Sequence, residues 1–432
     1  MKALCAPLVA LVVIAAAPAR STLAQTPSPS PSPSPSPPPP AVTATSPIRL
    51  MAAVTVRQDF TSVEDQTDLL QDENSIDGLR ARIRFGVEYR DPQSVVAGGL
   101  RFSLGENPNP TSPFIRLGDS FRAQSFGLDQ FYLVVRPFKN RDAVVFSAGK
   151  VPQPFWRGDQ GTVRSELVWD DDVSPIGLVL NDTLHKSSDE ARPVRVENTL
   201  GYFVMEEPTD FRFAGVTGKA YLIADQLHVQ AKRVSGAVAY YAYRNLNAGL
   251  RSPSFVPGQG GFVLPGTPPF LLRPGLQLTN NQVNFGPGAD GFTEDDFDVL
   301  DLLGQVHVPL PVSGGGDPQV FVLGEYTRNF RPERARNAWG ASVGVRGGGW
   351  KGSGAHPYTV YVTYRDVDAD AVLATFADSD LGAGTAVKGF EAGANYRFQR
   401  NLVLAVSYFD FEGFPRKDNS VSRVFIDLTW DF

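Results

Sequence analysis

The chain closes with the stretch "VFIDLTWDF", which covers Val424–Phe432 and alternates strictly between two kinds of residue. In an extended strand, successive side chains point to opposite faces. One face would therefore carry only apolar side chains, namely Val424, Ile426, Leu428, Trp430 and Phe432. Because chain termini usually fray, alternation that continues up to a final aromatic residue predicts a terminal strand held in place by pairing.

A second stretch, "LRARIRFGVEYR" over Leu79–Arg90, shows the same period of two. Its apolar residues alternate with a set that includes Arg80, Arg82 and Arg84. A helix would spread these charges around its circumference, whereas a strand separates the two sets completely. The stretch therefore predicts a strand with one apolar face and one face rich in arginine.

The same pattern predicts sixteen strands, near residues 48–60, 77–90, 95–105, 127–137, 142–150, 175–182, 193–205, 214–226, 235–245, 297–309, 318–328, 337–347, 357–366, 387–398, 401–410 and 420–432. The connections at one end would be long, at 61–76, 106–126, 151–174, 206–213, 246–296, 329–336, 367–386 and 411–419. Those at the other end include short turns at 91–94, 138–142 and 399–401. An even number of strands with this asymmetry is typical of an outer-membrane barrel, and sixteen strands leave room for an aqueous channel.

No segment after the N-terminal region approaches the ~18 consecutive apolar residues of a transmembrane helix. In hydrocarbon every backbone polar group needs an internal partner, so a membrane protein without such helices must be a closed barrel. The prediction is an all-β, closed antiparallel transmembrane barrel over 48–432, with long extracellular loops and short periplasmic turns. Its last strand would pair with its first. Aromatic residues would mark the short-turn end of the outer face: Tyr89, Tyr396, Phe398, Trp430 and Phe432.

The N-terminal region predicts export. Residues 1–24 combine Lys2, a short apolar run and small residues before Gln25, as in a secretory signal peptide. Residues 25–47 are rich in proline and serine, which predicts an extended periplasmic linker that could contact the cell wall. Cys5 falls in the signal, so the mature chain would use no disulfides. A net charge of −6 argues against a nucleic-acid partner.

The third long connection, 151–174, contains prolines and Trp156 and Trp169, which favour packing over free solvation. A loop folded into the barrel would bring its acidic run, Asp170, Asp171 and Asp172, opposite the arginine row. Two alternatives remain open for the acidic run. It could lie on a solvated surface loop, or it could bind Ca²⁺, although a run of three aspartates lacks the usual ligand spacing.

The arginine row of Arg80, Arg82 and Arg84 should face the lumen, since exposing a guanidinium to the bilayer midplane costs ~2–4 kcal/mol. Together with the acidic run, it is the predicted pore-lining and selectivity site. A net basic wall would favour anions in a narrow, water-filled constriction. Alternatively, the arginines pair with acids such as Glu88 and those of the third loop and mainly maintain shape.

An enzymatic function is not predicted. The four histidines, His185, His228, His307 and His356, are expected in or beside the short-turn end, as turn or rim residues. No nucleophile elbow, phosphate-binding loop or Cys/His metal spacing occurs, so no cofactor is expected and no metal site is assigned.

Three stretches resemble the bacterial putative porin family: "DQFYLVVRP" (129–137), "AGKVPQPFW" (148–156) and "SELVWDDDVSPIGLVLN" (165–181). The resemblance covers most of the chain from Ile48 to Phe432. It implies an outer-membrane channel and a third long loop that folds into the lumen. Phe432 also resembles the C-terminal signal that the outer-membrane assembly machinery recognises on many barrels. The resemblance implies no particular solute.

The expected function is passive diffusion of small hydrophilic solutes or ions through the outer membrane of a Gram-negative bacterium, with mild anion preference. The partners would be outer-membrane lipid, the assembly machinery and the solutes, with a homotrimer left open. Two alternatives are an adhesin or envelope tether, which would use loop 246–296 and the linker, and a soluble secreted β-sandwich.

Overall fold

The structure is a computed structural model that describes residues 46–64, 74–91, 94–104, 114–117, 126–138, 143–159, 161–189, 193–206, 219–246, 296–311, 317–332, 336–349, 356–378, 380, 384–413 and 419–432. The predicted signal peptide and the linker up to residue 45 lie outside these ranges, as does most of loop 246–296.

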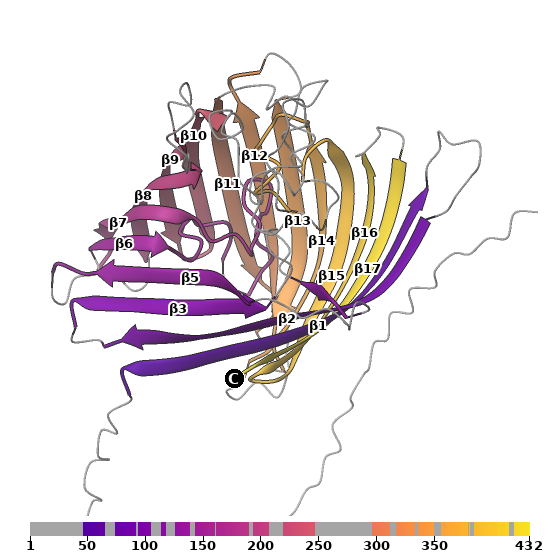
Figure 1. Ribbon diagram of the computed structural model, residues 1–432, viewed down its shortest axis with the longest axis horizontal. Coiled ribbons are helices and arrows are strands. Elements are labelled where there is room, and N and C mark those ends of the chain that lie inside the picture. The colour runs from indigo at the N-terminus through magenta and orange to yellow at the C-terminus, as the bar shows by residue number, and fades with distance from the viewer. Residues whose placement is uncertain are drawn as a thin grey trace, which may run out of the picture. The chain divides into compact units, whose positions relative to one another are not determined.

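The described residues form seventeen strands: β1 (Ile48–Glu64), β2 (Asn74–Arg90), β3 (Val96–Leu104), β4 (Ile115–Arg116), β5 (Phe126–Val135), β6 (Val144–Lys150), β7 (Ile176–Lys186), β8 (Val194–Glu206), β9 (Ala220–Ala231), β10 (Val234–Arg244), β11 (Phe297–Pro309), β12 (Gln319–Asn329), β13 (Asn337–Gly347), β14 (Tyr358–Val367), β15 (Val387–Gln399), β16 (Leu402–Gly413) and β17 (Asn419–Asp431). Sixteen of them build the barrel wall (Figure 1). The exception is the two-residue β4, which pairs only with β2.

The wall closes by antiparallel pairing of β17 with β1. Their register runs from Ala53 opposite Asp431 to Glu64 opposite Ser420. The Phe432 N–H continues the ladder by donating to the carbonyl oxygen of Ala52 at 2.8 Å. The prediction that the last strand pairs with the first is confirmed.

The strand boundaries follow the alternation closely in most places, and β11 and β13 have the predicted limits. The eighth predicted strand, 214–226, is displaced, because β9 covers Ala220–Ala231. Its inward residues Leu222 and Ala224 are apolar and its outward residue Asp225 is polar, so the alternation is blurred in the first half of the strand.

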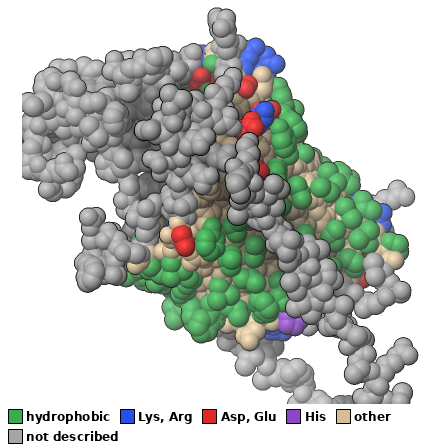
Figure 2. Space-filling model, turned by 90° about the vertical axis from the view of Figure 1, so that its right-hand side faces the viewer, with side chains coloured by type: hydrophobic (Ala, Val, Ile, Leu, Met, Phe, Trp, Pro, Cys, Tyr) green, Lys and Arg blue, Asp and Glu red, His purple; other side chains and the backbone are tan. Residues whose placement is uncertain are grey.

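The outward face of the strands is apolar. Large exposed side chains such as Leu50, Val343 and Val360 cover it, and Figure 2 shows broad patches of apolar side chains in green. Five outward aromatic residues lie at the short-turn end, as predicted: Tyr89, Tyr396, Phe398, Trp430 and Phe432. A second outward set lies toward the long-loop end: Tyr202, Tyr221, Tyr326, Trp339 and Tyr364. An apolar band between aromatic girdles is the surface of a transmembrane barrel.

The closed single sheet excludes the soluble β-sandwich, which needs two sheets packed face to face. In the part of the chain that the structure describes, no helix has the length and apolarity needed to cross a membrane.

Deleting Phe432 should reduce the amount of folded protein in the outer membrane. The deletion removes the last hydrogen bond of the closing ladder and the ring contact with Trp430, whose centroid lies 4.4 Å away. Heat-modifiable mobility on a gel reports the folded barrel. Phe432→Tyr keeps the terminal aromatic residue and should retain normal levels; unchanged levels in the deletion would contradict this role.

Candidate pore constriction

Residues 151–175, here called the crossing loop, leave β6 and cross the interior of the barrel before they enter β7 (Figure 1). One side of the loop is apolar and packs on the inner wall. Phe155 is its central side chain, with ring centroids 5.3 Å from Tyr241, 5.8 Å from Trp169 and 6.0 Å from Phe203. Burial of this aromatic cluster explains why the loop lies inside the barrel.

Asp159 anchors the tip of the crossing loop to the wall. Its carboxylate accepts hydrogen bonds from the Trp156 indole and the Ser235 hydroxyl, each at 3.1 Å, and lies 2.8 Å from Nε2 of His307. The Asp159 N–H donates to Oε1 of Gln305 at 2.7 Å. The wall therefore holds the loop tip with the Ser235 hydroxyl of β10 and with the Gln305 amide and the His307 imidazole of β11.

Two histidines differ from the sequence-based expectation. His228 and His307 lie beside the short-turn end, as predicted, but they are buried on the inward faces of β9 and β11 rather than exposed in turns. His228 stacks on Trp156, with ring centroids 4.7 Å apart. Alternation within their strands places them inward, but the sequence does not indicate which loop residues they contact.

A second loop, residues 368–386 between β14 and β15, also folds inward. Its apolar run from Ala371 to Ala377 is nearly all buried, with Leu373 1% exposed. The Asp170 N–H donates to the Phe376 carbonyl at 2.6 Å, and the Asp378 N–H donates to the Glu166 carbonyl at 3.1 Å. These hydrogen bonds join this companion loop to the crossing loop.

Loop 367–386 joins β14 to β15 at the long-loop end, as the sequence predicts, but its residues 371–377 fold into the barrel instead of extending beyond it. The physical reason is its composition, because "AVLATFA" (371–377) is too apolar to remain exposed to water. This apolar run is the feature of the sequence that indicates an inward fold of the loop. The structure places it against the crossing loop, where Phe376 stacks on Trp169 with ring centroids 5.4 Å apart.

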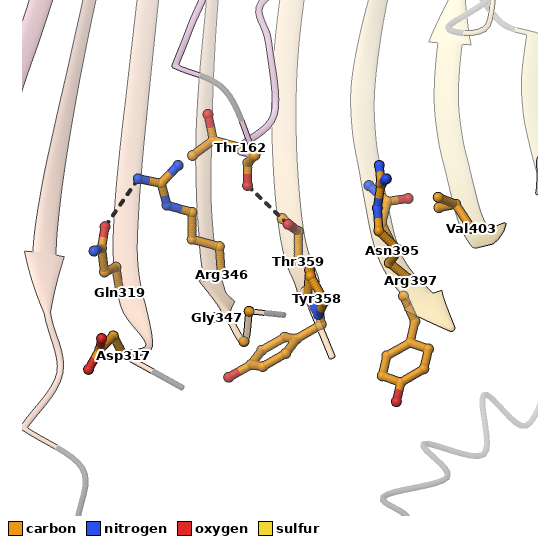
Figure 3. Close-up of a pocket in the computed structure, with 15 residues that line it drawn as sticks. Thr162, Asp317, Gln319, Arg346, Gly347, Tyr358, Thr359, Asn395, Arg397 and Val403 are labelled. Carbon is orange, nitrogen blue, oxygen red and sulfur yellow. Dashed lines mark hydrogen bonds between the residues drawn. The ribbon is translucent and has the colours of Figure 1, made fainter. Parts of the chain in front are cut away.

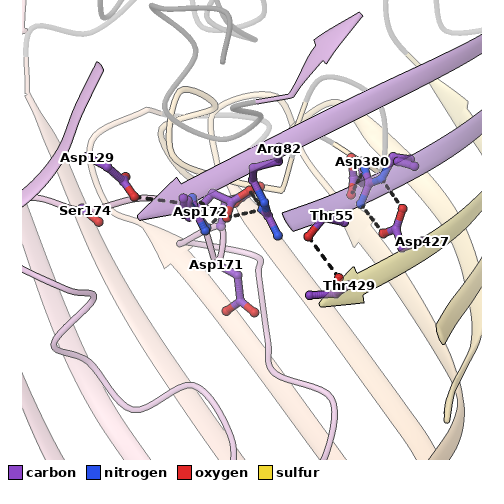
Figure 4. A network of polar contacts seen from close by, with 12 residues as sticks. Thr55, Arg82, Asp129, Asp171, Asp172, Ser174, Asp380, Asp427 and Thr429 are labelled. Carbon is purple, nitrogen blue, oxygen red and sulfur yellow. Dashed lines mark hydrogen bonds and ion pairs between the residues drawn. The ribbon is translucent and has the colours of Figure 1, made fainter. Parts of the chain in front are cut away.

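The arginine row of β2 faces inward and makes ion pairs (Figure 4). Arg82 contacts Asp172 at 2.8 Å, and Arg84 contacts the same carboxylate at 3.0 Å. Arg84 also lies 3.2 Å from Asp129 of β5. Arg80 instead pairs with Asp59 of the adjacent β1 at 2.5 Å. Arg82 and Arg84 thus contact the crossing loop, whereas Arg80 contacts only the wall among these partners.

Arg57 of β1 adds a fourth inward guanidinium. It contacts Asp427 at 2.8 Å and Asp380 of the companion loop at 3.2 Å. Its guanidinium lies between the rings of Phe114 and Phe425, 4.4 Å and 4.1 Å from their centroids. The sequence alone does not indicate a role for Phe114 or Asp380, because they reach Arg57 from loops distant in sequence.

These groups enclose a polar cavity of about 330 Å³, here called the eyelet, which is lined by Arg57, Arg82, Arg84, Phe114, Glu166, Asp170, Asp171, Asp172 and Asp380. Five of the six predicted site residues line it, whereas Arg80 does not. Guanidiniums project from the β1–β2 wall and carboxyls from the two loops, so the eyelet has a basic side and an acidic side.

Burial and the nearby Asp378 carboxyl raise the pKa of Glu166 well above its usual range. Burial and the neighbouring Asp172 carboxylate raise the pKa of Asp170 in the same way. Burial alone would also raise the pKa of Asp172, but Arg82 and Arg84 outweigh it and lower that pKa. In the eyelet, Glu166 and Asp170 therefore keep their protons to higher pH than ordinary carboxyls do, whereas Asp172 loses its proton more readily.

The acidic run does not have the contacts of a Ca²⁺ site. Asp172 is bound by two arginines, and Asp171 contacts the guanidinium of Arg157. Within the described ranges, no group of three or more His, Cys, Asp or Glu side chains is arranged to hold a metal ion.

The model of a family described as "Putative porin" matches residues 40–262 and 331–432. The chain belongs to this porin family. It is therefore an outer-membrane β-barrel protein with a porin-type channel. No curated protein matches the sequence.

Solved structures are similar to this porin at low sequence identity. The "High pH structure of Pseudomonas putida OprB" is 12% identical with a TM-score of 0.50, and the match covers 89% of this chain and 94% of that one. A triple mutant of the Rhodopseudomonas blastica porin is 14% identical with a TM-score of 0.44, covering 89% and 100%.

Leu373→Ala should loosen the attachment of the crossing loop and raise single-channel conductance. The change leaves a cavity where the two loops meet, at a cost of ~2–5 kcal/mol. Val343→Ala, on the outward face of β13, is the matched control and should leave conductance unchanged. Equal conductance in wild type and Leu373→Ala, with both folded, would show that the companion loop does not support the crossing loop.

Raising the pH should shift the selectivity of this porin toward cations. The raised pKa values of Glu166 and Asp170 mean that both carboxyls lose protons as the pH rises, which adds negative charge to the eyelet. Reversal potential under a salt gradient, measured from mildly acidic to alkaline pH, reports the shift. Glu166→Gln with Asp170→Asn should suppress it. Glu412→Gln, at an exposed position of β16, should not; an identical shift in the double variant would contradict the assignment.

Proposed function

We propose that this porin allows passive diffusion of small hydrophilic solutes and ions across the outer membrane, with mild anion preference. The observation that carries the proposal is the eyelet, where guanidiniums of β1 and β2 face carboxyls of two inward loops. A polar solute that crosses it exchanges water contacts for contacts with groups of both signs. No chemical step is required, because size and charge at the eyelet decide passage.

The sign of the preference follows from the balance of charges. The lining sets three guanidiniums, those of Arg57, Arg82 and Arg84, against five carboxyls, and the raised pKa values of Glu166 and Asp170 reduce the negative charge of two of these carboxyls. The eyelet is then close to neutral, because the crossing loop supplies acids that offset the arginines. The cavity beyond the loop tip adds Arg346 and Arg397 against Asp317. The surplus of positive charge in this cavity supports a weak anion preference.

In the proposed orientation, the long-loop end is extracellular and the short-turn end is periplasmic. The strand β1 then begins on the periplasmic side. An adhesin or tether would depend mainly on residues 247–295 and the linker, most of which lie outside the described ranges. Channel recording separates the two functions, since an adhesin without a channel carries no current.

Purified protein in a planar bilayer should show stepwise conductance and a reversal potential of weak anion preference. Replacing Arg82 and Arg84 with Gln should shift that potential toward cations, because both line the eyelet. Arg80→Gln is the matched control from the same row, and its shift should be smaller because Arg80 pairs with Asp59 outside the eyelet. Absence of conductance would overturn the channel function, and equal shifts would overturn the role of the eyelet.

A further inference from the structure

The tip of the crossing loop separates two cavities at the short-turn end of the interior. Gly158 and Asp159 border one of about 670 Å³, and Gly161 and Thr162 border the other of about 690 Å³. The first cavity is mixed in charge, with acidic Asp159 and Glu197 beside basic and imidazole groups: Lys232, Arg346, His228 and His307. The second, here called the basic cavity, has Arg346 and Arg397 against the single acid Asp317 (Figure 3).

The basic cavity is built on three adjacent strands. Arg346 of β13 lies opposite Thr359 of β14, and Thr359 lies opposite Asn395 of β15. Arg397 follows Asn395 by two residues and so shares its inward face. Adjacent strands are ~4.8 Å apart, which places both guanidiniums at one cavity, with Thr359 of β14 on the strand between them and the Asn395 amide beside Arg397.

Contacts from the protein position the two arginines. Arg346 donates from Nη2 to Oε1 of Gln319 at 3.1 Å, and Arg397 donates from Nη1 to the Arg400 carbonyl at 2.8 Å. Gly161 has a φ of +77°, and a Cβ there would lie 3.5 Å from Nη1 of Arg346. The loop tip therefore lies beside this guanidinium, and the Thr359 hydroxyl holds it there by donating to the Gly161 carbonyl at 3.1 Å.

Guanidiniums recognise phosphate and carboxylate oxygens through paired N–H donors. Two of them around a cavity favour a solute with more than one anionic oxygen group, because each can bind a separate part of it. The amides of Gln319 and Asn395 offer additional hydrogen bonds to such a solute. We propose that the basic cavity is a binding subsite for small polyvalent oxyanions that bear phosphate or carboxylate groups.

This inference rests on the proposed channel function and gives it a solute class. The cavity is open to water, and salt screens its charge over ~8 Å at physiological ionic strength. Binding should therefore be weak enough for release, as passage through a channel requires. A solute held here would obstruct the flow of chloride through the same lumen.

The test uses the full chain in a planar bilayer with chloride as the current carrier. Inorganic phosphate added on the short-turn side should lower the chloride current by at least about twofold at millimolar concentration. Succinate in a parallel experiment distinguishes a preference for phosphate from one for dicarboxylates. Arg346→Gln with Arg397→Gln should require at least about fivefold more anion for the same block. Arg195→Gln, at an inward position of β8 on the other side of the loop tip, is the control.

The outcomes separate this inference from the channel function. Wild-type protein without current would overturn the channel function. A chloride current that neither anion lowers would overturn the subsite alone. An equal block in wild type and the double variant would overturn its assignment to the two arginines. If the double variant lacks a heat-modifiable band, Arg397→Gln alone replaces it, with a smaller loss of block expected.

Discussion

Closure of the sheet is the constraint on which the rest of this structure depends. Hydrocarbon provides no hydrogen-bond partners, so each strand needs a neighbour on both sides, and β17 must pair with β1. Once the sheet is closed, the period of two separates an apolar outer face from an inner face that can carry arginine and aspartate. A ring of sixteen strands is also too wide for its own side chains to fill. The interior must therefore be narrowed by chain that is not part of the wall.

The two inward loops meet that need, and their chemistry follows from their position. Apolar residues of both loops bury against each other and against aromatic wall residues. Their acids contact the arginines that the inner face already carries. Removing one partner of such a pair leaves the other charge without its contact inside the barrel. The ion pairs that hold the loops are thus the same groups that a passing solute meets, so folding and selectivity constrain the same residues.

The sequence predicted the barrel well because alternation is a local property. Strand number, closure and the inward direction of Arg82 and Arg84 follow from it without knowledge of distant contacts. The alternation does not show which group each charged side chain contacts. Asp172 and Asp380 reach the wall from loops whose paths depend on packing. Phe114 comes from a third connection and lies against Arg57. His228 and His307 contact the tip of the crossing loop, which is distant from both in sequence. The companion loop was missed because its position in a long connection outweighed its apolar composition.

The two inward loops arise from opposite sides of the ring. The crossing loop joins β6 to β7 and the companion loop joins β14 to β15, and these connections are eight strands apart in a wall of sixteen. Backbone hydrogen bonds between Asp170 and Phe376, and between Asp378 and Glu166, link them inside the barrel. The pair is therefore a cross-brace along a diameter of the ring. A barrel braced in this way resists flattening into an ellipse, so lateral pressure from the bilayer should alter its bore less than that of an unbraced ring.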